Sequence, residues 1–342
     1  MKADLAVHAL TPQGARLARA LSGELCADLF LPRKLAGKGE RAFDSLPANV
    51  AGVFHEYGGH VFVAACGIVV RALAPLLRGK ASDPAVVVMD QEGRHAVSLL
   101  SGHLGGANDL ARRAAAFTGG EAVITTATDT AGLPSLDLLA RDCGLRIENM
   151  EAVKGVNAGL LEGRTVQVFD PESRLAVPAR HCELFEWVAA PHHLEPGRPR
   201  VAVTWRAPPL PEGCLVLRPR VVVAGVGCRK GAPATDILEA VLEACRMKGA
   251  APASLAALAS IEAKRGEPGL AEAARALGVE TVFFPAERLG AVSVPNPSAN
   301  ALKHMGVESV CEAAAMLAGG TDKLLLPKMK TSNVTVALAL AD

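Results

Sequence analysis

Aromatic side chains are scarce in this chain of 342 residues, which has nine Phe, two Trp and one Tyr. Neither sign of charge is in excess: the formal net charge is only +1, and no basic run stands out. Proteins that bind nucleic acids need basic grooves, and single-stranded nucleic acid also needs aromatic stacking platforms. We therefore expect no nucleic-acid partner.

The eight cysteines include no Cys-x-x-Cys pair, and the chain is too long to be a disulfide mini-scaffold. We therefore expect reduced thiols and a cytoplasmic protein. No apolar stretch reaches the length of a membrane span, and the first ten residues lack the apolar run of a signal peptide. We expect no contact with a membrane.

A metal motif is also lacking. His55 and His60 resemble the His-Glu-x-x-His zinc motif, but one residue too many separates them, and Gly58 and Gly59 would break the helix that this motif needs. We predict neither a structural nor a catalytic metal.

What the chain does contain is a regular alternation of apolar runs and helical patterns, and half of its residues are hydrophobic. Over residues 1–142 this alternation, with buried runs such as Ala85–Met89, predicts an α/β domain. Proline becomes frequent over 143–219, which indicates a small α+β middle module. The alternation returns over 220–342. The prediction is two α/β domains with mostly parallel sheets, joined by the Pro-rich module.

The most site-like stretch is residues 98–109, SLLSGHLGGAND, where three glycines surround His103 just before a helical pattern. Glycines allow a positive φ and close approach to a ligand, and a helix start offers unpaired N–H groups. This predicts an anion-holding turn with His103 as a general base. The alternative is a histidine that only caps the helix or closes the turn. The predicted binding residues of this turn are Ser101, Gly102, Gly105, Gly106 and Asn108.

Asp90 and Arg71 follow two other predicted strands. Asp90 comes directly after the AVVVM run, at the end of a strand where open α/β sheets bind ligands, and is suited to acid–base work. The alternative is that Asp90 and Glu92 belong to a solvated hairpin turn. Arg71 lies one turn into a helical pattern, where it either grips a carboxylate or packs along the surface.

Residues 225–231, GVGCRKG, form a second glycine-rich stretch. The third glycine is one residue late for the dinucleotide fingerprint, no acidic residue follows at the required distance, and Gly-Lys-[Ser/Thr] is missing. The stretch predicts an anion nest and not an NAD or ATP site. The alternative is a tight turn needed only for packing. The binding candidates here are Gly225, Gly227, Cys228, Arg229 and Lys230.

Residues 260–264, SIEAK, place Glu262 and Lys264 two positions apart. On an extended segment both would point to the same side, as a catalytic pair or a carboxylate-binding pair. The alternative is a surface ion pair, which contributes little. Lys328 and Lys330 either line the mouth of a site or are simply exposed.

Long motifs follow one another in both halves of the chain. The first half has GIVVRALAPLLRGK at 67–80, DPAVVVMD at 83–90, SLLSGHLGGAN at 98–108 and ITTATD at 124–129. The second half has GVGCRKG, SIEAK, then FP at 284–285, VPNPS at 294–298 and KTSNV at 330–334. Their order resembles that of the cobalt-precorrin-5A hydrolases of the anaerobic cobalamin pathway, and the likeness covers nearly the whole chain.

The resemblance implies hydrolytic opening of the ring-A acetate δ-lactone of cobalt-precorrin-5A, a cobalt tetrapyrrole. The C-20 carbon and its methyl group then leave as acetaldehyde, and the product is cobalt-precorrin-5B. The enzyme would be a hydrolase acting on a carbon–carbon bond. Since cobalt is carried by the substrate, no cofactor is required.

For that reaction His103 is our first choice as the base that activates water, Glu262 the second, and Asp90 a further catalytic candidate. The backbone N–H groups of Gly105 and Gly106 are candidate donors to an oxyanion or carboxylate. We expect Arg71, Lys264 and the residues of the two glycine stretches to hold the acidic arms of the macrocycle.

Two other interpretations remain open. One is a non-catalytic tetrapyrrole-binding scaffold of the same pathway. The other is a nucleotide-dependent enzyme that uses GVGCRKG. A homodimer and transient contact with neighbouring pathway enzymes are further expectations.

Overall fold

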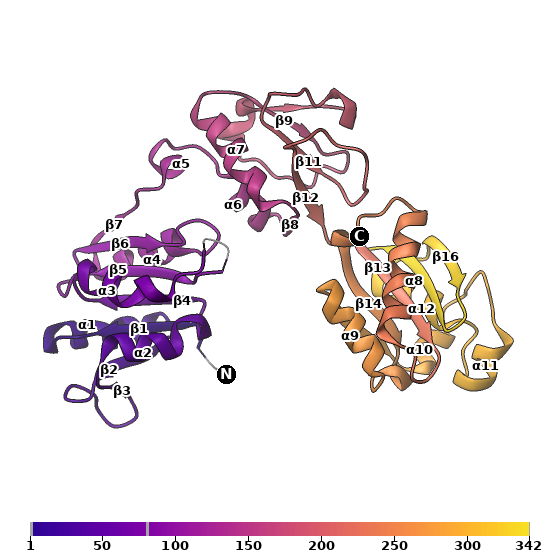
Figure 1. Ribbon diagram of the computed structural model, residues 1–342, viewed down its shortest axis with the longest axis horizontal. Helices are drawn as coiled ribbons and strands as arrows, with labels where there is room; N and C mark the ends of the chain where they lie inside the picture. Colours follow the sequence, from indigo (N-terminus) through magenta and orange to yellow (C-terminus); the bar gives the residue numbers. More distant parts are fainter. Residues whose placement is uncertain (1–2, 80–81, 342) are drawn as a thin grey trace. The chain divides into compact units, whose positions relative to one another are not determined.

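The computed structural model describes residues 3–79 and 82–341. The chain divides into two compact units, Met1–Leu138 and Leu139–Asp342. The first holds a seven-stranded sheet and the second holds two five-stranded sheets, each accompanied by helices (Figure 1). The predicted α/β class with mostly parallel sheets is confirmed. The module boundaries at 142/143 and 219/220 stay predictions.

The sheet of the first unit has the order β3-β2-β1-β4-β5-β6-β7. All neighbouring pairs are parallel except β5 and β6, which form an antiparallel hairpin. The carboxyl end of β6 therefore lies at the sheet edge opposite to the carboxyl ends of β1, β4 and β5. The strands are β1 (Leu5–Ala9), β2 (Asp28–Pro32), β3 (Arg41–Phe43), β4 (Gly59–Val63), β5 (Ala85–Met89), β6 (His95–Leu100) and β7 (Glu121–Val123).

Helices cover both faces of this sheet. Strand residues alternate in direction, so Val7 and Val61 pack under α1 and α4, whereas Phe62 and Val88 pack under α2 and α3. These four helices are α1 (Pro12–Glu24), α2 (Leu46–Val53), α3 (Cys66–Leu73) and α4 (Ala107–Thr118), with 3-10 turns η1 (Phe54–Glu56) and η2 (Ala74–Leu76). Helix α5 (Ala127–Thr130) follows β7, and α6 (Leu136–Asp142) spans the boundary between the two units.

The middle sheet has the order β10-β9-β11-β12-β8, and only β8 is antiparallel to its neighbour. Helix α7 (Met150–Leu161) contacts β9 and β12. The other elements are β8 (Leu145–Ile147), β9 (Val166–Phe169), β10 (Phe185–Trp187), β11 (Arg200–Val203), β12 (Leu215–Pro219), η3 (Ala179–Leu184) and η4 (Pro191–His193).

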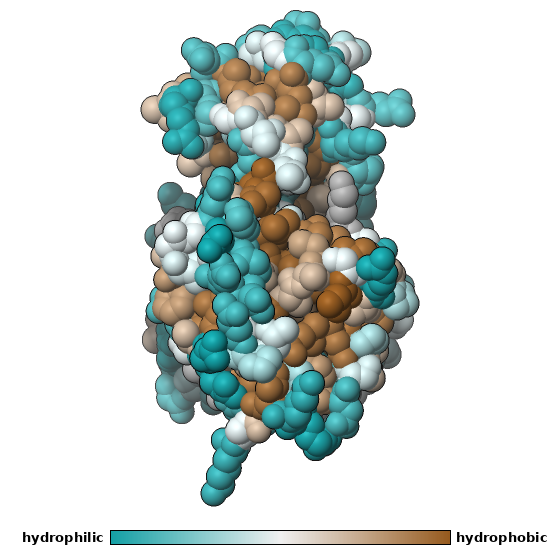
Figure 2. All heavy atoms as spheres, turned by 90° about the vertical axis from the view of Figure 1, so that its left-hand side faces the viewer, coloured by the Kyte–Doolittle hydropathy of each residue, from teal (hydrophilic) through white to brown (hydrophobic). Residues whose placement is uncertain are grey.

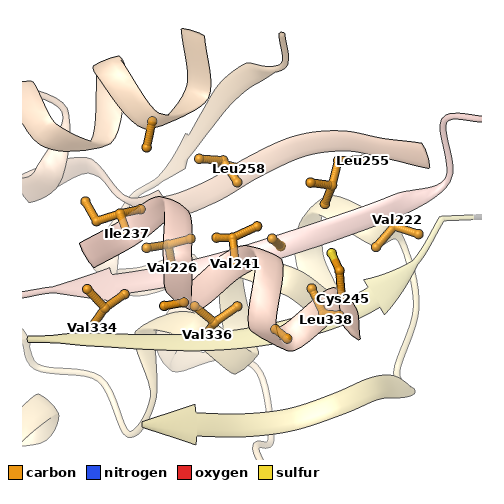
Figure 3. Close-up of a cluster of buried hydrophobic side chains, with 14 of the residues drawn as sticks. Val222, Val226, Ile237, Val241, Cys245, Leu255, Leu258, Val334, Val336 and Leu338 are labelled. Carbon is orange, nitrogen blue, oxygen red and sulfur yellow. The ribbon is translucent and has the colours of Figure 1, made fainter. Parts of the chain in front are cut away.

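The third sheet has the order β15-β14-β13-β17-β16, with two parallel pairs and two antiparallel pairs. Its strands are β13 (Val222–Cys228), β14 (Leu255–Ile261), β15 (Glu280–Phe284), β16 (Leu324–Lys330) and β17 (Val334–Leu340). On one face, Ile237 and Val241 of α8 (Ala234–Met247) pack onto Val226 and Val336 (Figure 3).

Helix α12 (Val310–Gly319) packs on β13 and β17 through Cys311 and Ala315. The remaining helices of this unit are α9 (Pro268–Leu277), α10 (Ala286–Gly290) and α11 (Ala299–Met305), with 3-10 turns η5 (Pro252–Ser254) and η6 (Glu262–Lys264). No helix in the described part of the chain is long and apolar enough to cross a membrane.

The glycine turn predicted at 225–231 is wrong for its first four residues, which extend β13. Gly225 and Gly227 are paired with β17 across the sheet. A Cβ on Gly225 would overlap the carbonyl oxygen of Cys311. The glycine is therefore needed because α12 approaches the strand closely, which is the packing alternative. The turn itself starts at Arg229, and Gly231 has a φ of +72°.

Candidate functional site

The turn that follows β6 is compact and internally bonded. Ser101 has a φ of +57° and Gly106 one of +85°. The N–H of Gly106 donates to the carbonyl of His103 at 2.8 Å, and the N–H of Asn108 donates to that of Gly102 at 3.0 Å. The predicted role of Gly106 as an oxyanion donor is therefore wrong, because its N–H is used inside the turn. Gly105 is needed for a close approach, since a Cβ there would overlap Ser101.

His103 lies between two carboxylates. Its Nε2 is 3.1 Å from Oδ2 of Asp129 and 3.1 Å from the hydroxyl of Thr128. Its Nδ1 is 3.3 Å from the hydroxyl of Ser135 and 3.5 Å from Oδ2 of Asp137. The side chain is 20% exposed, so the imidazole is accessible yet fixed on both sides.

Asp129 joins the SGHLGGAN and ITTATD motifs. It accepts hydrogen bonds from Thr126 at 2.8 Å, from Asn108 at 2.9 Å and from Arg112 at 2.6 Å. Asn108 is only 3% exposed, so it positions Asp129 instead of facing a ligand as predicted. Asp129 is the last residue of the ITTATD motif, so the sequence pointed to it, but no motif of the sequence contains Asp137.

The charges of His103, Asp129 and Asp137 stabilise one another. The pKa of His103 is raised, chiefly by its hydrogen bond to Asp137 and further by Asp129, while partial burial opposes the rise. Burial alone would raise the pKa of Asp137, but hydrogen bonds from His103 and Ser135 lower it to about 2. Burial would likewise raise the pKa of Asp129, but its hydrogen bonds hold it below its usual value. The two carboxylates therefore stabilise the protonated form of His103 relative to a free imidazole.

Asp90 lies elsewhere. Its carboxylate accepts backbone hydrogen bonds from Glu92 at 2.9 Å and His95 at 2.7 Å, and so closes the β5–β6 hairpin. Because that hairpin is antiparallel, Asp90 and His103 lie at opposite edges of the sheet. The prediction that Asp90 takes part in catalysis is not supported, and the hairpin alternative is confirmed.

Arg71 is exposed on α3, where it donates to the carbonyl of Gly67 at 2.8 Å. The same helix exposes Ile68 and Val70, each to 48%. Figure 2 shows one face of the molecule, on which apolar residues gather among hydrophilic ones. Lys80, the last residue of this motif, lies outside the described residues.

The predicted same-side pair of Glu262 and Lys264 is wrong. The extended segment ends at Ile261, and residues 262–264 form the 3-10 turn η6. The side chain of Glu262 is 54% exposed and lies 3.6 Å from Arg265. The side chain of Lys264 is 7% exposed and pairs with Glu267 at 3.0 Å.

The carboxyl edge of β13 and β14 nevertheless collects the other motifs. Glu267 accepts the N–H of Gly231 at 2.8 Å, so SIEAK and GVGCRKG meet there. The N–H of Arg229 donates to the carbonyl of Asn333 at 2.9 Å, which adds KTSNV. Arg229 and Lys230 are exposed at this edge. Burial raises the pKa of the Cys228 thiol, which favours a packed thiol over a reactive thiolate.

Within residues 3–79 and 82–341, no three His, Cys, Asp or Glu side chains are grouped to hold a metal ion. His60 of the rejected zinc motif is buried against His8, with 3.1 Å between ring nitrogens. That the protein needs no metal or cofactor of its own stays a prediction.

These features define a multi-sheet α/β protein with a fixed acid–base group at one edge and exposed cations suited to carboxylates at another. Family models match it in three regions: cobalamin synthesis G N-terminal at 48–129, cobalamin biosynthesis central region at 134–219 and cobalamin synthesis G C-terminus at 222–339. The chain belongs to the cobalamin synthesis G family, that of the cobalt-precorrin-5A hydrolases.

Two curated relatives match over nearly their full length. The cobalt-precorrin-5A hydrolase of Salmonella typhimurium is 37% identical over 348 residues, covering 99% of this chain and 98% of its own. That of Priestia megaterium is 32% identical over 365 residues, covering 99% and 95%. A solved structure of a putative cobalamin biosynthesis protein G homolog from Sulfolobus solfataricus is 19% identical with a TM-score of 0.40, covering 99% and 97%. The names of the curated relatives support a hydrolase of cobalamin biosynthesis.

Proposed function

We propose that this chain hydrolyses the ring-A lactone of cobalt-precorrin-5A and releases acetaldehyde, giving cobalt-precorrin-5B. The full-length likeness to two hydrolases of that name supports the substrate. The structural observation that carries the proposal is the imidazole of His103 held between Asp129 and Asp137. Cobalt belongs to the substrate in this proposal. The eight free cysteines suit a reducing compartment, so we place the reaction in the cytoplasm.

His103 is the proposed general base. Its two carboxylate neighbours stabilise the imidazolium, so they make neutral His103 a stronger base and orient its ring. To accept a proton from water, one ring nitrogen exchanges its contact with Thr128 or Ser135 for that water. Glu262, exposed beside Arg265, is the second candidate.

The proposed reaction has two stages. Water loses a proton to His103 and attacks the lactone carbonyl; the ester C–O bond breaks, and the imidazolium returns the proton to the departing oxygen. The freed hydroxyl then loses its proton as the adjacent carbon–carbon bond breaks. Acetaldehyde leaves, and the macrocycle takes up the electron pair and a proton.

The acidic arms of the macrocycle are the proposed ligands of the exposed cations. Arg71 of the first unit and Arg229 and Lys230 of the second are suited to carboxylates. Ser101, Gly102 and Gly105 stay candidate contacts in the histidine turn. Lys264 is committed to Glu267, so we assign it to supporting the turn at Gly231.

The substitution His103→Ala tests the proposal, with acetaldehyde release from cobalt-precorrin-5A as the readout. Loss of a positioned general base should slow turnover by about 10²–10⁴-fold. His95→Ala, an exposed histidine at the start of β6, is the matched control and should keep full activity. A loss of only a few-fold in His103→Ala contradicts the role of general base.

The pH dependence gives a second readout. With His103 as a base, kcat/KM should rise as the pH increases through its raised pKa. Asp137→Asn should move that inflection to lower pH, because Asp137 is the main cause of the raised pKa. If the unaltered protein binds the substrate but releases no acetaldehyde, the non-catalytic scaffold is the correct interpretation.

A further inference from the structure

Strand β16 is interrupted by a bulge on the way to the KTSNV hairpin. The pairing with β17 shifts between Leu326 and Met329, so that Pro327 and Lys328 lie opposite a single residue. Proline has no N–H to give to the ladder. The N–H of Lys328 donates instead to Oε1 of Glu312 on α12, at 2.9 Å. Bulges of this kind re-aim side chains.

Glu312 is 0% exposed and fixes the VPNPS segment at the same place. Its carboxylate accepts the side-chain amide of Asn296 at 2.7 Å and the backbone N–H of Asn296 at 3.2 Å. The ammonium of Lys328 donates to the carbonyl of Asn296. A buried carboxylate is costly unless it is well hydrogen-bonded, so these three residues form a built arrangement that holds one cation in place.

The ammonium of Lys328 retains donors for a ligand. An ammonium has three N–H donors, and the contact shown is one carbonyl. Among the described residues, no carboxylate forms an ion pair with Lys328. A half-buried ammonium that contacts a neutral carbonyl attracts an anion more strongly than a freely solvated lysine does.

We propose that Lys328 binds a carboxylate arm of the substrate, and that Glu312 and Asn296 position it for that task. The inference rests on the proposed function for the identity of the substrate. Across the sheet, Lys330 pairs with Thr335 and Thr335 with Gly227, so β16 and β13 are two strand spacings, about 10 Å, apart. A ligand that reaches Lys328 and also Arg229 must carry several separated carboxylates, as a tetrapyrrole with acetate and propionate arms does.

Binding of cobyrinic acid, a corrinoid with free carboxylate arms, to the full chain tests this site without any turnover. Lys328→Met should weaken binding at least about tenfold, as expected for loss of a charge-assisted hydrogen bond. Lys323→Met, an exposed lysine directly before β16, is the matched control and should change affinity less than about twofold. Equal affinity of Lys328→Met and the unaltered chain overturns the inference, as does a failure of the unaltered chain to bind.

Glu312→Gln tests the positioning role. The amide of Gln has one acceptor oxygen, which can replace Oε1, but its NH2 group cannot accept the backbone N–H of Asn296 that Oε2 accepts. Asn296 should therefore shift, and binding should weaken although Lys328 is present. If this variant unfolds, Lys328→Met still decides the question, because that ammonium lies outside the core.

Acetaldehyde release separates this inference from the proposed function. With cobalt-precorrin-5A, Lys328→Met should raise KM and leave kcat nearly unchanged. An unchanged KM in an active enzyme refutes the binding role and leaves the hydrolase intact. Binding of cobyrinic acid that depends on Lys328, in a chain that releases no acetaldehyde, refutes the hydrolase and supports the site.

Discussion

Histidines of the first unit occur in two opposite settings. His103 lies between carboxylates, and its pKa is raised. His8 and His60 are buried against each other, and His8 stacks between Phe30 and Phe62 at 4.9 and 4.5 Å. Burial is the main cause that lowers both pKa values, that of His60 to about 4. One setting favours a proton on the ring, and the other excludes protons from the core.

The buried pair predicts a loss of stability in acid. In the unfolded chain both histidines take up protons below a pH of about 6.5, whereas the folded chain keeps them neutral. Their contribution is therefore fully present above that pH and is lost as the pH falls towards about 4. Each histidine should contribute a slope of about 1.4 kcal/mol per pH unit to the free energy of unfolding.

Urea unfolding at several pH values across this window, followed by circular dichroism, measures the slope. His60→Gln should reduce the slope by about 1.4 kcal/mol per pH unit, the contribution of one proton, and the exposed His95→Gln should leave the slope unchanged. A slope that survives His60→Gln would mean that other groups cause the acid effect. His103 does not mask the result, since its stabilisation is present below a pH of about 6.5 and is lost as the pH rises through its raised pKa.

At the scale of elements, periodicity predicted much of the fold, and the AVVVM run is β5. The start of α1 is fixed by Thr11, whose side chain accepts the N–H of Gly14 at 3.0 Å. Two things that periodicity does not encode were missed. Periodicity does not show which neighbour a strand pairs with. The sequence therefore did not reveal that β6 runs antiparallel to β5, which places Asp90 and His103 at opposite edges of the sheet. Nor does periodicity show how closely a helix approaches, so Gly225 was assigned to a turn.

The close contact of α12 with β13 predicts a strong effect of Gly225→Ala. The added methyl overlaps the backbone of Cys311, so the helix must shift, at a cost of about 1–3 kcal/mol in unfolding free energy. Thermal or urea unfolding measures this cost. Gly52→Ala on α2, where a Cβ meets nothing within 4 Å, is the control and should be neutral or slightly stabilising. Equal stability of the two variants would contradict the packing argument.

At the scale of the molecule, motifs far apart in the sequence meet at defined edges. The order of these motifs made the family recognisable, and the structure explains part of that order. SGHLGGAN and ITTATD share Asp129, while SIEAK, GVGCRKG and KTSNV share one sheet edge. Asp137 escaped prediction because its role depends on where α6 begins in space, which no local pattern reveals.

Each unit has its own apolar cores, and the fluorophores are divided between them. Both tryptophans, Trp187 and Trp205, belong to the second unit, and the single tyrosine, Tyr57, to the first. Val7→Ala, in the core of the first unit, should lower stability there by about 2 kcal/mol. Circular dichroism should show the shift, and the tryptophan transition in urea should keep its midpoint. A tryptophan midpoint that moves equally would show that the chain unfolds as one cooperative system.

The bulge at Pro327 and Lys328 also makes this part of the gene tolerant of one in-frame deletion. Leu326 and Met329 pair with Leu338 and Val336, which lie two positions apart in β17 and therefore share a face. Removing the codon of Pro327 would leave one residue opposite Ala337 and restore the regular alternation, so the side chains on both sides would keep their faces. Loss of the Val336 codon, from the regular part of the ladder, would instead reverse the faces on one side of the lesion.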